Sequence, residues 1–282
     1  MLRAEPVTGP VAFHGEGPAW WPGWGGLRWV DLMAGDVLRL APDGSVERRH
    51  VGPRATAMRP RRAGGAVLAL ERGFALEDAG GRVRALPGLL EEGIRFNDGG
   101  CDPDGRFWCG TMAYDQRPGA AAMYRLDPGA AVVRAFGGLT ISNGLEWTAD
   151  GATAYFADTP TGRVDAFDYA PETGLTGRRP FAELPDGGGS PDGLTVDAAG
   201  GVWVAAYGGG CVRRYAPDGT LDAEVPVATS KPTACTFGGE DLDVLYITTT
   251  QEGLPPGSEP LAGALFAVRP GVRGLPARTF AG

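Results

Sequence analysis

The feature that most constrains the fold is a repeat of about 40 to 50 residues that consists only of short predicted strands. In each repeat an aromatic or aliphatic residue lies in an apolar strand after a glycine-containing turn. These anchor residues are Trp29, Leu68, Trp108, Tyr155, Trp203 and Tyr246, and neighbouring anchors are 39 to 48 residues apart. A period of this length, built from strands, is typical of the blades of a β-propeller.

The repeats leave no room for a second domain. Helical repeats of similar length would need amphipathic helices of about ten or more residues, and Gly or Pro interrupts nearly every such window. In the first repeat, residues 37–40 and 46–49 flank an Ala-Pro-Asp-Gly turn and alternate apolar with charged side chains. We therefore predict one all-β domain over residues 1–282, a six-bladed β-propeller with four-stranded antiparallel blades around a central channel.

Two segments remain open as the outermost strand of the last blade. Either residues 277–280 supply this strand, or the N-terminal residues pair there and close the ring. Residues 252–262 contain three prolines, and we expect them to form a long loop on one rim of the propeller.

Charge and cysteine content exclude several classes of function. The formal net charge of −8 argues against a nucleic-acid partner or a membrane-surface partner. We find no secretory signal and no apolar run of about 20 residues, so we expect a cytoplasmic protein. The four cysteines lack the Cys-x-x-Cys spacing of a zinc-thiolate site, and we expect them to be reduced and buried.

A polar residue opens the first strand of four repeats, 11 to 13 residues before the anchor. These residues are Glu16, Asn97, Asn143 and Asp192, and the matching positions hold Arg54 and Thr56 in the second repeat and Lys231 and Thr233 in the sixth. Because the innermost strands of a propeller surround the channel, equivalent positions lie on one ring. Carboxylate and amide oxygens suit Ca²⁺, Mg²⁺ or Mn²⁺ and can accept Zn²⁺ or Fe²⁺. Asn-Gly and Asp-Gly are also common turn dipeptides, but four of these residues in one register favour a shared site.

Several motifs occur in order along the chain. They are Gly15-Glu16-Gly17-Pro18-Ala19-Trp20, Arg95-Phe96-Asn97-Asp98-Gly99, Gly110-Thr111-Met112, Ser142-Asn143-Gly144-Leu145, Pro191-Asp192-Gly193 and Phe237-Gly238-Gly239. They resemble the signatures of the regucalcin/gluconolactonase family, which also takes in luciferin-regenerating enzymes, and the resemblance runs almost from end to end. It implies a six-bladed propeller that holds one divalent cation and hydrolyses sugar lactones.

The resemblance also implies roles for individual residues. The metal ligands of the family fall on Glu16, Asn143 and Asp192. Its substrate-contacting positions fall on Arg95 and Asn97, and a third, acidic contact falls on Asp115, where some relatives have glutamate.

Lactone opening needs an activated water and a polarised carbonyl, and a divalent cation provides both. We predict that Asp192 is the general base, because one of its oxygens can accept a proton while the other binds the ion. His14 stands where the family usually has an aliphatic residue, and strand alternation places it on the same face as Glu16. We expect His14, Tyr207 and Lys231 to surround the site without binding the ion.

The leading hypothesis is a metal-dependent lactonase acting on a pentono- or hexono-1,4- or 1,5-lactone. One alternative is hydrolysis of a phosphotriester, an aryl ester or an acyl-homoserine lactone by the same metal geometry. A second alternative is a calcium-binding propeller without catalysis, because fold alone does not decide function. The expected partner is a small-molecule lactone, and ring closure suits a monomer or a weak oligomer.

Overall fold

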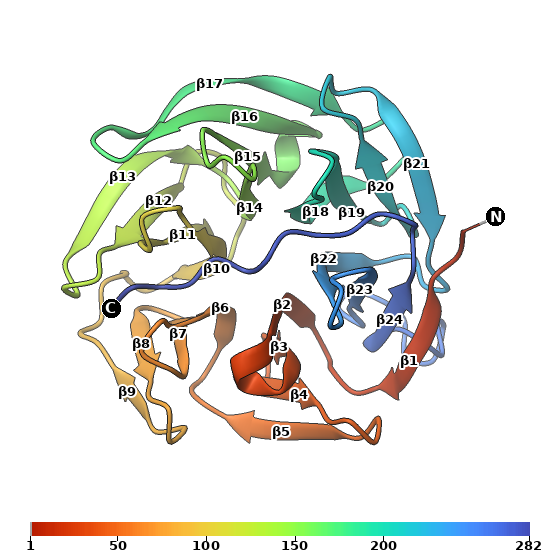
Figure 1. The fold of residues 1–282 in the computed structure, drawn as a ribbon, viewed down its shortest axis with the longest axis horizontal. Coiled ribbons are helices and arrows are strands. Elements are labelled where there is room, and N and C mark those ends of the chain that lie inside the picture. Colours follow the sequence, from red (N-terminus) through yellow and green to blue (C-terminus); the bar gives the residue numbers. More distant parts are fainter. Residues whose placement is uncertain (1) are drawn as a thin grey trace.

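The computed structural model describes residues 2–282, and its strands form six four-stranded sheets arranged in a ring (Figure 1). Each sheet is one blade, numbered here from the sheet that contains β2, and neighbouring strands in a blade are antiparallel. The predicted all-β, six-bladed propeller is therefore confirmed.

The strands have the following bounds. Blade 1 contains β2 (Gly15–Trp21), β3 (Gly26–Asp31), β4 (Asp36–Leu40) and β5 (Val46–His50), and blade 2 contains β6 (Ala55–Pro60), β7 (Ala66–Leu70), β8 (Phe74–Glu77) and β9 (Val83–Ala85). Blade 3 contains β10 (Ile94–Cys101), β11 (Phe107–Ala113), β12 (Ala121–Leu126) and β13 (Val132–Leu139), and blade 4 contains β14 (Ser142–Trp147), β15 (Thr153–Asp158), β16 (Arg163–Ala170) and β17 (Gly174–Glu183). Blade 5 contains β18 (Ser190–Val196), β19 (Val202–Tyr207), β20 (Cys211–Tyr215) and β21 (Leu221–Pro226), and blade 6 contains β22 (Pro232–Gly238), β23 (Val244–Thr249), β24 (Ala264–Val268) and β1 (Glu5–Pro10). Two short 3₁₀ turns follow β2 and β15, namely η1 (Pro22–Trp24) and η2 (Thr159–Thr161).

The N-terminal strand closes the ring. β1 pairs antiparallel with β24, with Glu5 opposite Ala267 and Pro6 opposite Phe266. Of the two segments left open by the sequence, the N-terminal residues therefore supply the last outer strand. A strand with prolines suits this place because the outer edge of a blade needs no further hydrogen-bond donors.

The C-terminal residues form a strap instead of a strand. Residues 269–282 cross the centre of one face of the ring, from blade 6 to the junction of blades 2 and 3 (Figure 1). At its far end the amide of Phe280 donates to the carbonyl oxygen of Pro60, and the amide of Ala281 donates to that of Gly105. The Phe280 ring is fully buried with Phe96 and Phe107. The strap therefore ties together blades that are distant along the chain.

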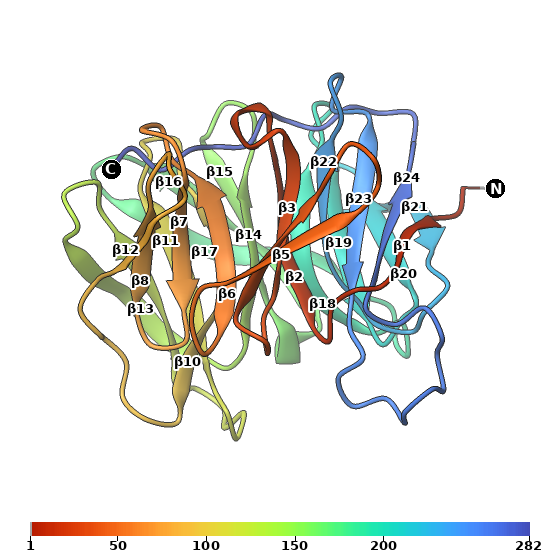
Figure 2. The same cartoon turned by 90° about the horizontal axis from the view of Figure 1, so that it is seen from below.

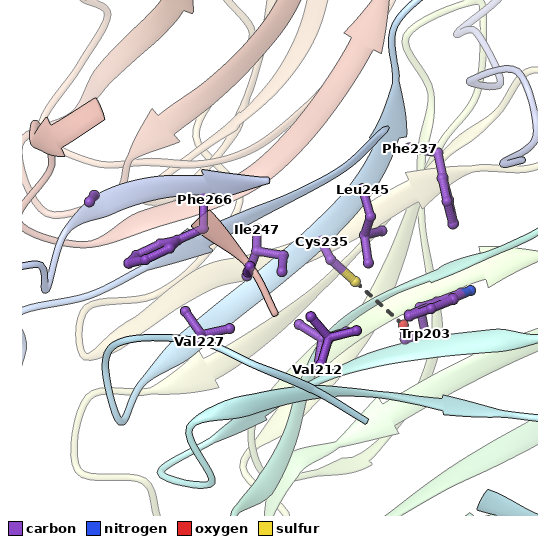
Figure 3. Close-up of a cluster of buried hydrophobic side chains, with 11 residues drawn as sticks. Trp203, Val212, Val227, Cys235, Phe237, Leu245, Ile247 and Phe266 are labelled. Carbon is purple, nitrogen blue, oxygen red and sulfur yellow. Dashed lines mark hydrogen bonds between the residues drawn. The ribbon is translucent and has the colours of Figure 1, made fainter. Parts of the chain in front are cut away.

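The hydrophobic core lies between neighbouring blades. Inner strands such as β19 are buried on both faces, whereas outer strands such as β5 are exposed or only partly buried along their whole length. Figure 3 shows the core between blades 5 and 6, which contains Trp203, Val212, Cys235, Leu245, Ile247 and Phe266. Full burial of one such large side chain stabilises the fold by about 1.5–3 kcal/mol. All four cysteines are free and buried, as predicted.

The two faces of the ring carry different segments. The strap lies on the upper face in Figure 2, and the long connection between β23 and β24 extends from the lower face. This connection, residues 250–263, contains the loop predicted over 252–262. In residues 2–282 no helix is long and apolar enough to cross a membrane.

Candidate active site

A register shift near the start of every inner strand positions the predicted site residues. The shifts lie between Glu16 and Ala19, Ala55 and Ala57, Phe96 and Gly99, Ser142 and Leu145, Pro191 and Leu194, and Pro232 and Ala234. A β-bulge of this kind re-aims a side chain that regular alternation would direct elsewhere. Asn97, Asn143 and Asp192 lie inside these bulges, and Glu16 lies at the edge of one.

The glycine after each of two site residues is required by the close approach of neighbouring blades. A Cβ on Gly193 would lie 2.4 Å from the Cβ of Ala234, and a Cβ on Gly144 would lie 2.6 Å from the amide nitrogen of Leu194. The Asn-Gly and Asp-Gly pairs therefore lie within β14 and β18 and not in turns.

Glu16, Asn143 and Asp192 are all buried on inner strands of different blades. Burial and, after it, the charges of Glu16 and Asp98 raise the pKa of Asp192 well above its usual value. The Oδ1 atom of Asp192 is buried and has no hydrogen-bond partner among residues 2–282. A buried carboxylate oxygen without a partner is costly, so this atom is poised to accept a proton or to bind a cation.

A chain of hydrogen bonds joins three blades beside these carboxylates. Arg95 Nη1 donates to Asn97 Oδ1 (2.6 Å), and Asn97 Nδ2 donates to Asn143 Oδ1 (2.8 Å). Asn143 Nδ2 in turn donates to Thr159 Oγ1 (2.6 Å), whose hydroxyl donates to the carbonyl oxygen of Pro191 (2.8 Å). The chain fixes which way the Asn143 amide faces, so its oxygen lies on the Asn97 side.

His14 links the site to the loop that follows β23. Its Nε2 lies 3.7 Å from Glu16 Oε1, and its Nδ1 lies 3.0 Å from both Glu252 Oε2 and Thr250 Oγ1. Burial by itself lowers the pKa of His14, but the hydrogen bonds and charges of Glu16 and Glu252 outweigh it and raise the pKa to about 9. The predicted proximity of His14 to Glu16 is therefore found.

Tyr207 and Lys231 lie on the same side of the molecule as His14. Lys231 Nζ donates to the backbone oxygen of Glu252 (2.8 Å) and lies 5.0 Å from the centroid of the Tyr207 ring. Burial, followed by the charges of Glu252, Asp192 and Glu16, raises the pKa of Tyr207 to about 12. Lys231 therefore contacts both Tyr207 and Glu252, and Glu252 in turn contacts His14 beside Glu16.

Asp115 is not gathered with the other predicted residues. It lies in the turn after β11, its side chain is 61 % exposed, and its Oδ2 forms an ion pair with Arg117 Nη1 at 2.8 Å. The threonines at the matching positions of blades 2 and 6 are buried and bonded to backbone, since Thr56 donates to Ala69 and Thr233 donates to Gly15.

Three residues in or beside the site were missed from the sequence. Thr159 orients Asn143, Glu252 holds His14, and Asp98 lies next to Asn97 in the same bulge. Burial raises the pKa of Asp98 to about 6, and the charges of Glu16 and Glu146 add to this effect while that of Arg59 opposes it. Asp98 could have been found from the sequence because it stands in the Asn97-Asp98-Gly99 motif. Thr159 and Glu252 come after the ends of β15 and β23, and no sequence motif marks them.

The donor set fits a hard divalent cation. Asp192 offers an unpartnered buried oxygen, Glu16 a second carboxylate, and Asn143 an amide oxygen with a free lone pair beside its bond to Asn97. Within residues 2–282 no group of three or more His, Cys, Asp or Glu side chains is arranged to hold a metal ion. The predicted set contains only two such side chains, because its third member is an amide.

A separate cavity of about 270 Å³ lies beneath the strap, at the opposite end of the channel. Arg59, Glu146 and Arg278 line it together with apolar residues, and none of the predicted site residues does. The predicted site is therefore not part of this cavity, and the functional end of the channel has to be argued from the chemistry of its side chains. The paired carboxylates and the hydrogen-bonded asparagines favour the other end.

The propeller and the carboxylate–amide site at its channel define the class of this protein. The chain belongs to the SMP-30/gluconolactonase/LRE-like family, whose model matches residues 14–251.

Individual relatives share most of their length with this chain. Regucalcin of Oryctolagus cuniculus is 35% identical, with 100% of this chain and 99% of the relative covered. Pentonolactonase XacC of Haloferax volcanii is 38% identical over 83% of this chain and 81% of the relative. The 6-deoxy-6-sulfogluconolactonase of Pseudomonas putida is 38% identical over 95% of both chains.

Two solved structures have closely similar folds. A luciferin-regenerating enzyme superposes with a TM-score of 0.91 at 27% identity and covers 100% of both chains. A calcium-binding regucalcin from Agrobacterium tumefaciens superposes with a TM-score of 0.90 at 27% identity, covering 99% of this chain and 97% of that one.

Proposed function

We propose that this protein is a hydrolase that opens sugar lactones to sugar acids, and that Glu16, Asn143 and Asp192 hold a divalent cation in its site. The observation that carries the proposal is the buried Oδ1 of Asp192, which has no hydrogen-bond partner in residues 2–282 and lies within the influence of the Glu16 charge. Two relatives are named as lactonases, for a pentonolactone and for 6-deoxy-6-sulfogluconolactone, and both names support this reaction. The calcium-binding description of the Agrobacterium regucalcin supports the cation.

A bound divalent cation would supply Lewis acidity at the lactone carbonyl and would lower the pKa of a nearby water. Asp192 accepts a proton from the attacking water as the water oxygen adds to the carbonyl carbon. Asp192 then returns this proton to the ring oxygen as the bond between that oxygen and the carbonyl carbon breaks. One water is consumed and one sugar acid is formed.

Arg95 and Asn97 position the substrate. Arg95 is buried, and its Nη1 donates to Asn97 Oδ1 and to the carbonyl oxygen of Phe96, so the guanidinium is held in one orientation. Its remaining donors suit the hydroxyl groups of a sugar. Asp115 is exposed, and its carboxylate keeps acceptor sites free beside the bonds from Arg117 Nη1, so it can accept a hydrogen bond from a sugar hydroxyl that reaches it.

The Asp192→Ala variant tests the proposal, and Asp218→Ala is a matched control because it alters the same Pro-Asp-Gly sequence in an exposed turn. With glucono-1,5-lactone and xylonolactone as substrates, kcat/KM is expected to fall by about 100-fold or more in Asp192→Ala and to stay unchanged in the control. Full activity in Asp192→Ala, or in fully chelated protein, would overturn the proposal. Faster turnover of paraoxon than of either lactone would favour a different esterase, and calcium binding without turnover would favour a non-catalytic protein.

A further inference from the structure

Lys231 is a cation beside the site that forms no salt bridge in residues 2–282, although the charges of Glu252 and Glu259 lie close enough to act on it. It is the only lysine among the 26 basic residues of the chain. Its Nζ makes one hydrogen bond, to the backbone oxygen of Glu252, and forms no salt bridge within 4.0 Å in the described part of the chain. The side chain is only partly exposed, so its ammonium is not simply solvated.

Contacts on two sides connect Lys231 to the carboxylates of the site. On one side the Glu252 side chain contacts His14, whose ring lies 3.7 Å from Glu16. On the other side the Tyr207 ring lies under the ammonium, and Tyr207 pairs with Ser190 at the start of the strand that carries Asp192. Lys231 therefore lies beside the site and not on a remote surface.

A second cationic side chain of the site also lacks a salt bridge. Arg95 is also buried without a salt bridge in residues 2–282, because its Nη1 bonds are to Asn97 and to the Phe96 backbone. Arg95 and Lys231 therefore both keep donors that no carboxylate of residues 2–282 occupies within 4.0 Å. An anionic group on the substrate would give a partly buried cation the charged partner that it lacks.

We propose that Lys231 binds an anionic substituent of the substrate, so that the preferred substrate is a lactone with a phosphate, sulfonate or carboxylate group away from the lactone carbonyl. This inference rests on the proposed lactone hydrolysis and adds the substrate class. A lysine ammonium binds such groups as a point charge through its free donors, and the Tyr207 ring below holds it in place by a cation–π contact.

Comparing glucono-1,5-lactone with 6-phosphoglucono-1,5-lactone tests the inference. We expect kcat/KM to be about tenfold or more higher for the phosphorylated lactone. The Lys231→Met variant should lower the ratio of the two kcat/KM values by about 10- to 100-fold, the usual contribution of a hydrogen bond to a charged group. Arg269→Met removes one positive charge from an exposed ion pair with Asp243 and should leave the ratio unchanged.

Binding supplies a readout that does not depend on turnover. Calorimetry in calcium-containing buffer should show tighter binding of glucitol 6-phosphate than of glucitol, and Lys231→Met should abolish the difference while Lys231→Arg keeps part of it. Hydrolysis of both lactones with the same ratio in wild type and Lys231→Met would overturn this inference and leave the proposed function standing. Hydrolysis of neither lactone by the wild type would overturn both.

Discussion

Asn97 of blade 3 donates its Nδ2 hydrogen to Oδ1 of Asn143 in blade 4, across a distance of 2.8 Å. The neutral member of the proposed ligand set is therefore oriented by a residue from another blade. The same Nδ2 also donates to the carbonyl oxygen of Ser142 (2.7 Å), so the asparagine fixes both the side chain and the backbone at this point.

Replacing Asn97 by leucine should weaken cation binding even when no substrate is present. Leucine has a similar size but cannot donate, so Asn143 loses the partner that orients its amide. Loss of such a supporting bond typically costs about 10- to 100-fold in metal affinity. Calorimetric titration with Ca²⁺ or Zn²⁺ measures the effect. Unchanged cation affinity together with reduced lactone turnover would indicate that Asn97 acts on the substrate and not on the cation.

Substituting Gly193 by alanine should damage the site and the fold together. The new methyl would lie 2.4 Å from the Cβ of Ala234, so blades 5 and 6 must separate or the bulge that carries Asp192 must move. Overpacking of this kind costs about 1–3 kcal/mol of the free energy of unfolding. Urea unfolding and lactone turnover measure the two effects. The control is Gly88→Ala, where no atom lies within 4 Å of the added methyl.

Asp192→Asn should stabilise the protein when the cation has been removed. In chelator at pH 8 the buried Oδ1 of Asp192 has no hydrogen-bond partner in residues 2–282 and the Glu16 charge disfavours a second charge beside it, so an uncharged amide lowers the electrostatic cost. A gain of about 1 kcal/mol raises Tm by about 2 °C or more. In the wild type, added cation should raise Tm, whereas in Asp192→Asn it should not. A wild type more stable than the variant in chelator would contradict this account.

Asp98 should make stability depend on pH in a defined window. The pKa is about 6 in the folded protein and near 3.8 when unfolded, so the folded state holds the extra proton between these values. Stability is therefore lost as pH rises from about 4 to about 6, by about 3 kcal/mol in total. In chelator, Asp98→Asn should match the wild type at pH 4 and exceed it at pH 7. Parallel curves for the two proteins would show that Asp98 does not titrate in this window.

The repeat was predictable because it depends on residue type at a fixed spacing, and the polar residues that open the inner strands were located from the same spacing. The glycines after Asn143 and Asp192 lie where an added Cβ would meet the neighbouring blade. The sequence predicted that both the asparagine and the aspartate open inner strands, as found, but it did not predict the bulges. A bulge depends on the pairing register with the next strand, which residue types alone do not encode. The ring-closing strand remained open because residues 5–10 contain two prolines and no clear alternation.

Other parts of the site depend on contacts between residues far apart in the chain. Glu252 reaches His14 only after ring closure brings the last blade beside the first. Asp115 precedes Gln116, whose φ of 55° is rarely adopted outside glycine, and this turn determines how far the carboxylate extends into solvent. The role of Asp115 in substrate binding stays a prediction.

The strap gives the ring a second closure, independent of the seam between β1 and β24. If the ring were closed only by this pairing, the pairing could break and the blades could then separate one after another. Because Phe280 anchors the chain on the far side of the circle, a break at the seam still leaves blade 6 tethered to blades 2 and 3. Partial opening of the ring therefore gains little chain entropy. We expect the backbone amides of all six inner strands to exchange with solvent at the same limiting rate, because they become accessible only when the whole ring unfolds.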